Sequence, residues 1–395
     1  MDFLIDNIEE DAERTRLRKE RAARMRMEKQ RQMRLRRRMK MMLKVSVGIF
    51  AVVLVLAVGV IIFNGKTEED VLVSKEQDEF VSRQKETDAV QETQQQTMEQ
   101  QEPETEPPVT PAEPLTLAVA NGEIYSFEST PNTVAIYNEE IISSNIILVN
   151  EETNKIVASK GAKERISPAS MTKVLTLLVA AENITEEQLD DTFVMTREIT
   201  DYGYVNDCSA VGFLDGEKIT IRDLFYGTIL PSGGDAAVGL ATYVAGSHEA
   251  FVEMMNEKLE ELGLGNTSHY TNCVGIYDKE HYSTVYDMAV IMKAAIQNEF
   301  CKKILAEHNY TTEATTEHPE GINISNWFLR RIEDYDTGGE VLCAKTGYVD
   351  ESRSCAVSYG TFADGNPYIC VTTGSSSSWK CIYDHIEIYN EYVSS

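Results

Sequence analysis

Residues 167–183 read SPASMTKVLTLLVAAEN, and this stretch decides the fold class. Ser167 can cap a helix and Pro168 suits a first helical turn, so the sequence predicts that a helix begins here. From Val174 to Ala181 the side chains are apolar on nearly every face of that helix. A helix that is apolar all round must be buried on all sides. We therefore expect it to lie at the centre of a sizeable domain.

Strand-like segments precede this helix and return near the end of the chain. Apolar and β-branched runs predict strands at 144–150, 155–159, 341–347, 354–361 and 368–373. Helical spacing predicts helices at 234–245, 248–262, 286–297 and about 379–393. Strands at both ends of a helical middle indicate an α+β domain. We expect one five-stranded antiparallel sheet with a helical subdomain.

Three short motifs follow one another along the chain: Ser170-Met171-Thr172-Lys173, Ser232-Gly233-Gly234 and Lys345-Thr346-Gly347. Lys173 follows Ser170 by three residues, so both side chains lie on one helix face. A serine hydroxyl is a poor nucleophile until a base takes its proton. Burial beside a second cation would lower the pKa of Lys173 enough for it to be that base, and Lys345 is the candidate cation. A further S-x-x-K match, Ser377 to Lys380, is interpreted as chance.

The three motifs match the S-x-x-K, S-x-N and K-T-G set of penicillin-binding proteins and serine β-lactamases at every position but one. Residues from about 144 to 375 resemble the low-molecular-mass penicillin-binding proteins, the serine D-alanyl-D-alanine carboxypeptidases of peptidase family S11. The stretches that carry this resemblance are ISPASMTKVLTLLVA, DLFYGTILPSGGDAAVGLATYVAGS, FVEMMNEKLEELGLGNT, HYSTVYDMAVI and AKTGYVDESRSCAVSYG.

The resemblance implies a β-lactamase/transpeptidase-like fold and an acyl-enzyme reaction that removes the terminal D-alanine from peptidoglycan stem peptides. Ser170 would be the nucleophile, with Lys173 and Ser232 as the other catalytic residues. The backbone N–H groups of Ser170 and Tyr348 would form the oxyanion hole, and β-lactams would acylate Ser170 as inhibitors. The substrate-binding residues would be Lys345, Thr346, Gly347, Tyr348, Gly234 and Lys380. Thr346 would help to hold the terminal carboxylate, and Lys380 is a more speculative partner for it.

Gly234 departs from the family pattern, which usually has an amide side chain there. A missing hydrogen bond of this kind costs about 1.5–3 kcal/mol, which would slow the reaction rather than abolish it. A low-activity or non-catalytic peptidoglycan-binding or sensor module therefore stays open as an alternative. A β-lactamase is a lesser alternative, because no E-x-x-x-N convincingly follows Ser232 before Lys345.

The charge distribution divides the chain. Residues 1–44 carry 15 basic and 8 acidic side chains, whereas the other 351 residues carry 22 basic and 56 acidic side chains. Between these regimes Val45 to Phe63 holds no charged residue and is long enough for a transmembrane helix. The positive-inside rule puts residues 1–44 in the cytoplasm and everything after Gly65 outside the cell membrane. A cleaved signal peptide is the competing interpretation.

Residues 64–114 are rich in Glu, Gln, Thr and Pro, so we expect a disordered acidic linker before a folded domain at 115–395. An acidic body repels phosphate backbones, which excludes nucleic acid as the main ligand. The seven cysteines include no C-x-x-C pair, and the six histidines have no metal-ligand spacing. We therefore expect no cofactor, cysteines that are mostly buried, and a structural role for His281.

Overall fold

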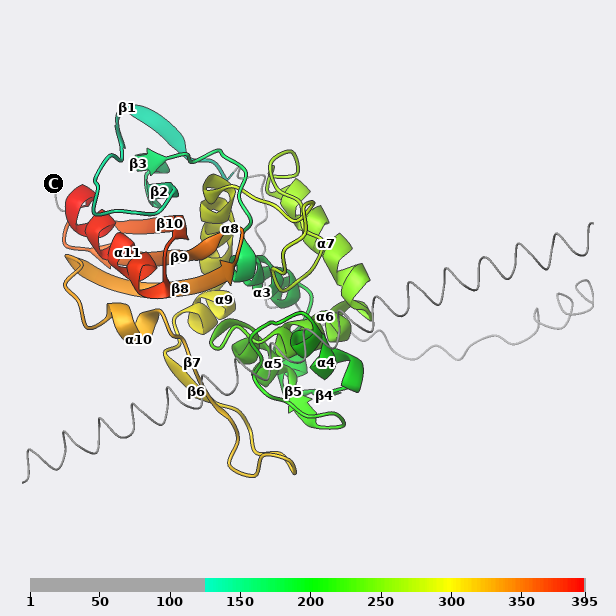
Figure 1. The fold of residues 1–395 in the computed structure, drawn as a ribbon. Coiled ribbons are helices and arrows are strands. Elements are labelled where there is room, and N and C mark those ends of the chain that lie inside the picture. The colour runs from blue at the N-terminus through cyan, green and yellow to red at the C-terminus, as the bar shows by residue number, and fades with distance from the viewer. Residues whose placement is uncertain (1–124, 394–395) are drawn as a thin grey trace, which may run out of the picture. The chain divides into compact units, whose positions relative to one another are not determined.

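The computed structural model describes residues 125–393. The predicted cytoplasmic segment (1–44), membrane helix (45–63) and linker (64–114) lie outside the described residues. Within residues 125–393 no helix combines the length and the apolar character that crossing a membrane requires. The described part is an α+β domain, as expected (Figure 1).

A six-stranded sheet forms the frame of the domain, in the order β1-β3-β2-β10-β9-β8. Its strands are β1 (Glu128–Ala135), β2 (Asn145–Asn150), β3 (Lys155–Lys160), β8 (Gly339–Val349), β9 (Arg353–Phe362) and β10 (Pro367–Ser375). All neighbours pair antiparallel except β1, which runs parallel to β3. The prediction of five antiparallel strands is therefore wrong by one strand, and the sheet is mixed.

The missed strand β1 has a sequence, ESTPNTVA, without apolar alternation, and most of its residues are exposed. It also contains a proline, which an edge strand tolerates because one side of its backbone needs no partner. The strand is thus formed by pairing with β3 rather than by its own pattern. The other five strands were predicted to within a few residues.

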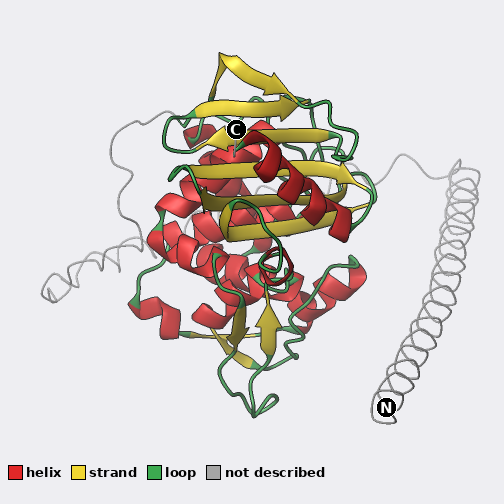
Figure 2. Ribbon diagram, turned by 90° about the vertical axis from the view of Figure 1, so that its left-hand side faces the viewer, coloured by secondary structure: helices red, strands yellow, loops and turns green. Residues whose placement is uncertain are grey.

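The sheet separates two hydrophobic cores. Along β2, Ile147 and Val149 pack in the larger core, and Ile146 and Leu148 pack in the smaller one. Successive side chains of a strand point to opposite faces, so one strand serves both cores. Figure 2 shows α11 (Ser378–Tyr392) lying across one face of the sheet, with most other helices behind the opposite face.

The predicted apolar helix is α3 (Lys173–Glu182), and all its residues except Glu182 are buried. Its predicted central position is confirmed. A 3-10 turn, Ala169–Thr172, leads into it, with Pro168 as N-cap. The predicted cap by Ser167 is wrong, because the turn begins one residue later and the Ser167 Oγ is buried without a hydrogen-bond partner among the described residues.

The helical region surrounds α3 with α4 (Arg197–Val205), α5 (Ile221–Ile229), α6 (Gly234–Ala245), α7 (His248–Glu261), α8 (Val285–Gln297) and α9 (Glu299–Leu305). The predictions for α6, α7, α8 and α11 are confirmed to within one or two residues. Two small hairpins, β4 (Thr192–Val194) with β5 (Lys218–Thr220) and β6 (Asn309–Thr311) with β7 (Asn323–Ser325), and the short helix α10 (Leu329–Ile332) complete the domain.

Candidate active site

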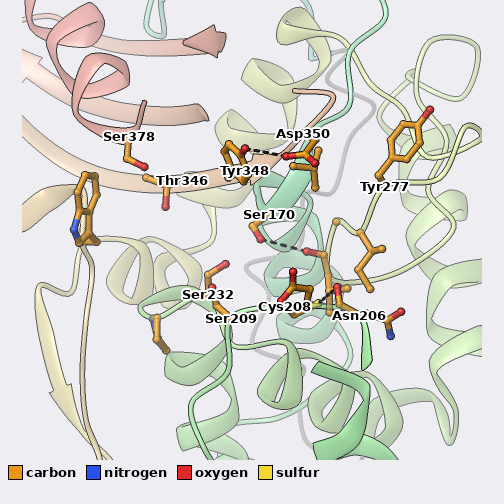
Figure 3. A pocket seen from close by; sticks show the side chains of 18 of the residues that line it. Ser170, Asn206, Cys208, Ser209, Ser232, Tyr277, Thr346, Tyr348, Asp350 and Ser378 are labelled. Carbon is orange, nitrogen blue, oxygen red and sulfur yellow. Dashed lines mark hydrogen bonds between the residues drawn. The ribbon is translucent and has the colours of Figure 1, made fainter. Parts of the chain in front are cut away.

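One cleft of about 790 Å³ brings the three sequence motifs together. Ser170 reaches it from the turn before α3, Ser232 from the loop before α6, and Thr346, Gly347 and Tyr348 from the edge strand β8. Figure 3 shows Ser170, Ser232 and Thr346 facing the same hollow. Residues separated by more than 170 positions in the chain thus line one site.

The Ser170 hydroxyl and the Lys173 amine are in direct contact. Lys173 Nζ lies 3.1 Å from Ser170 Oγ and donates a second hydrogen bond of 2.7 Å to the Val274 carbonyl. Lys173 is 1% exposed, whereas Ser170 is partly exposed and lines the cleft. This is the arrangement that a base and a serine nucleophile require.

Burial changes the acidity of both motif lysines. It lowers the pKa of Lys173 to about 8, although nearby groups, including Cys208, partly offset the effect. Burial also lowers the pKa of Lys345 well below its usual range, and the charge of Lys173 lowers it further. A neutral amine beside Ser170 is therefore accessible near neutral pH, as a general base requires. The lowered pKa of Lys173 is caused mainly by burial, and not by the charge of Lys345 as the sequence suggested.

The backbone on both sides of the cleft is strained. Ala169, directly before Ser170, has φ 47°, and Ser232 has φ 63°. Residues with a side chain seldom adopt this left-handed region, at a cost of about 1–3 kcal/mol each, and such outliers cluster at functional sites. The Ser232 Oγ is a buried atom with no hydrogen-bond partner among the described residues, and Ser232 lines the cleft.

The strand that carries Lys345, Thr346 and Gly347 is the last of its sheet, so it has one unpaired edge. A Cβ on Gly347 would lie 2.9 Å from the Ser170 backbone nitrogen and 3.0 Å from the Ala169 Cβ. Only a glycine lets β8 approach the start of the 3-10 turn Ala169–Thr172 this closely. Lys345 is buried and donates to the carbonyl of Thr346 at 2.9 Å, whereas Tyr348 is 62% exposed.

Beside the second motif, the cleft is lined by a segment from another part of the chain. Gly234 has no side chain, and its backbone N–H donates to the Ser209 carbonyl at 2.7 Å. That bond fixes the segment 206–209, which lines the cleft opposite β8 with Asn206, Asp207, Cys208 and Ser209. No sequence motif marks this segment as part of the site.

Three buried polar residues support the site, and two of them, Asn272 and Asp235, were not predicted from the sequence. The Asn272 Oδ1 accepts hydrogen bonds from the backbone N–H groups of residues 274–276, which fixes the carbonyl that binds Lys173. The Asp235 carboxylate accepts N–H groups of the loop at 211–213. His281 Nε2 contacts Thr172 Oγ1 at 2.9 Å, which confirms its predicted structural role.

Lys380 does not belong to the cleft lining. Its ammonium group donates to the Glu140 carbonyl at 3.3 Å, and its backbone N–H donates to the Ser377 Oγ, which caps α11. The neighbouring Ser378 lines the cleft instead. The prediction that Lys380 contacts the substrate carboxylate therefore finds no support in this geometry, because the side chain is already used between α11 and the segment before β2.

Six of the seven cysteines are buried and all seven are unpaired, in line with the sequence expectation. Across the described residues 125–393, no group of three or more His, Cys, Asp or Glu side chains is arranged to hold a metal ion.

Known proteins are similar to this chain in both sequence and fold. The D-alanyl-D-alanine carboxypeptidase family (peptidase S11) matches residues 131–377. The carboxypeptidase DacF of Bacillus subtilis is 32% identical over 211 residues, which are 53% of this chain and 51% of DacF. The D-alanyl-D-alanine carboxypeptidase of Streptomyces sp. strain K15 is 30% identical over 239 residues, 58% of this chain and 79% of that protein.

The crystal structure of the Streptomyces K15 DD-transpeptidase superposes with a TM-score of 0.59 and 26% identity, covering 66% of this chain and all of that one. The chain spans about half the length of the Bacillus relative, so the likeness concerns the domain and not the whole protein. The family match extends over more than half of the chain and includes all three motifs of the cleft. The chain therefore belongs to the D-alanyl-D-alanine carboxypeptidase family, peptidase S11.

Proposed function

We propose that this protein is a serine D-alanyl-D-alanine carboxypeptidase that trims peptidoglycan stem peptides. The observation that carries the proposal is the 3.1 Å contact between Lys173 Nζ and Ser170 Oγ, at a cleft bordered by Ser232 and the edge strand β8. The family membership and the pKa of Lys173, about 8, support the same conclusion.

In the proposed reaction, Ser170 Oγ attacks the carbonyl carbon between the two terminal D-alanines while the neutral Lys173 amine takes the hydroxyl proton. The backbone N–H groups of Ser170 and Tyr348 bind the oxyanion, and one such donor typically contributes about 3 kcal/mol. The C–N bond breaks, and D-alanine leaves with a proton returned to its nitrogen. Water then hydrolyses the ester, which releases the shortened stem and restores Ser170.

The edge strand suits an extended peptide. An unpaired strand edge offers backbone N–H and C=O groups to a ligand that runs alongside it. Thr346 would bind the terminal carboxylate of the stem peptide, and Lys345 would add positive charge near the reacting centre when it is protonated. β-Lactams, which resemble the terminal dipeptide, would acylate Ser170 in the same position.

The test compares the wild type with Ser170→Ala and with Ser378→Ala, a control serine from the same cleft. Intact-mass measurement after penicillin treatment should show one adduct on the wild type and on Ser378→Ala, and none on Ser170→Ala. A peptide ending in D-alanyl-D-alanine should release D-alanine with the first two proteins only. An adduct on Ser170→Ala would refute the assignment of the nucleophile.

The same assay separates the alternatives. Peptide binding without D-alanine release would favour the binding or sensor module, which the missing side chain at Gly234 supports. Sustained penicillin hydrolysis instead of one stable adduct would favour a β-lactamase. Because the structural relative from Streptomyces K15 is a DD-transpeptidase, an added amine acceptor should also be tested for acyl transfer.

We also propose that residues 45–63 anchor the protein in the cell membrane, with 1–44 in the cytoplasm and the catalytic domain outside, joined by the linker 64–114. The support is the uncharged run Val45 to Phe63 between a basic and an acidic region. Protease added to spheroplasts should digest the catalytic domain and leave an epitope at the N-terminus intact. Digestion of both, or of neither, would contradict this topology.

A further inference from the structure

The side chain that Gly234 lacks is replaced in space by the side chain of Cys208. A Cβ added to Gly234 would lie 3.0 Å from the Cys208 Cβ, 3.4 Å from the Ser209 carbonyl oxygen and 3.6 Å from the Cys208 Sγ. A separation of 3.0 Å is closer than van der Waals contact between carbon atoms. The position next to Gly234 is therefore already occupied by a residue from another segment.

The Cys208 segment is held firmly against the start of α6. The Cys208 N–H donates to the Gly203 carbonyl at 2.8 Å, and Gly234 N–H donates to the next residue, Ser209, at 2.7 Å. Just beyond it, the buried Asp235 carboxylate accepts the N–H groups of Val211 and Gly212, both at 2.9 Å. Three of these hydrogen bonds thus link the loop to residues 234 and 235, and the fourth ties Cys208 to α4.

Cys208 also differs from the other cysteines in its surroundings. It is half-buried and lines the cleft with Ser170 and Ser232, whereas the other six cysteines are buried (Figure 3). Burial raises the pKa of its thiol above the usual value, although the charge of Lys173 acts in the opposite direction. A neutral thiol is a weak hydrogen-bond donor and a compact apolar group, not an ion or a strong nucleophile.

We propose that Cys208 contacts the acylated part of the bound peptide or β-lactam and takes the place of a side chain at position 234. The family loop S-x-N would thus be completed here by two segments, with Ser232 from the loop before α6 and the third side chain from residue 208. This inference rests on the proposed function, because it assigns a substrate contact in the same cleft.

The first test exchanges the two side chains and measures the rate of penicillin acylation. Gly234→Asn alone should slow acylation about tenfold, because its side chain meets Cys208. Cys208→Gly alone should also slow acylation, because neither residue 208 nor residue 234 then has a side chain to contact the substrate. The double variant Cys208→Gly/Gly234→Asn should recover to within about threefold of wild type, since residues in contact are coupled. Losses that simply multiply in the double variant, with unchanged melting temperatures, would overturn the inference.

The second test uses the unmodified protein. Methyl methanethiosulfonate should react in the native state with Cys208 and leave the buried cysteines unmodified, as intact mass and peptide mapping would show. Prior acylation by penicillin should block that reaction. Equal modification of Cys208 in the acylated and free protein would refute the contact. Failure of acylation itself would instead refute the proposed function, so the two failures are distinguishable.

Discussion

Raising the pH should activate Ser170 through the ionisation of Lys173. The perturbation is a series of buffers from pH 6 to pH 10 at constant ionic strength. Burial lowers the pKa of Lys173 to about 8, and its Nζ lies 3.1 Å from Ser170 Oγ. Only the neutral amine can accept the serine proton, so the acylation rate should follow the neutral fraction of Lys173.

The size of the effect follows from this value. With a pKa of about 8, about 1% of the amine is neutral at pH 6 and about 50% at pH 8. The second-order rate of acylation by penicillin should therefore rise about 50-fold between these pH values, and less than about twofold more up to pH 10. An unperturbed lysine would instead give a tenfold rise per pH unit through the whole range.

The assay is stopped-flow or quenched acylation followed by intact mass, at penicillin concentrations below saturation. Lys218→Ala, which removes an exposed lysine on β5, should keep the same profile as the wild type. Melting temperatures at each pH show that the domain stays folded. A rate that does not change between pH 6 and pH 8 would refute the role of Lys173 as base, and a continued rise to pH 10 would refute the lowered pKa.

Three further predictions concern two supports of the site and one buried carboxylate elsewhere in the domain. Gly347→Ala places a Cβ 2.9 Å from the Ser170 nitrogen and should slow acylation about 10- to 100-fold with a small change in melting temperature; a rate equal to wild type would contradict the close approach. Asn272→Ala should cost about 1–3 kcal/mol in unfolding free energy and also slow acylation, because three buried N–H groups lose their acceptor. Asn272→Asp keeps that acceptor but replaces the Nδ2 that donates to the Ile276 carbonyl at 3.0 Å, so it should also lose stability in chemical denaturation; wild-type stability and acylation in both variants would contradict this support. Burial alone would raise the pKa of Glu217, but hydrogen bonds led by that from His318 lower it overall, so Glu217→Gln should destabilise the domain at pH 7. That difference in melting temperature should shrink as the pH falls below 4.5, because a carboxylate with a lowered pKa loses its contribution on protonation.

The sequence predicts the core of this fold because its strongest signals are local. The run from Val174 to Ala181 is apolar all round and could only be a buried helix. The buried strands β2, β9 and β10 are likewise marked by β-branched and apolar runs. In contrast, β1 has no alternating pattern and forms only because β3 offers it a backbone edge, which is a tertiary effect that local propensity does not contain.

The motif residues could also be predicted, since Ser170, Lys173, Ser232 and the K-T-G strand carry recognisable spacing. The supporting residues could not, because their contacts cross long stretches of chain. Cys208 lies 26 positions before Gly234 and carries no motif of its own, so only the folded loop reveals that the two share one space. Lys380 illustrates the opposite error, since its distance along the chain from the K-T-G strand suggested a role that its contact with the Glu140 carbonyl does not support.

The burial of Lys173 has a thermodynamic consequence for the whole domain. Its pKa is about 8 when folded and 10.5 for an unperturbed lysine, so the unfolded chain binds more protons between these pH values and folding releases them. Stability should therefore increase with pH through this window. Below it the folded state carries the full penalty, on the order of 3 kcal/mol, from a shift of this size at about 1.36 kcal/mol per unit. The domain gives up that share of its folding free energy in order to hold a ready proton acceptor at neutral pH.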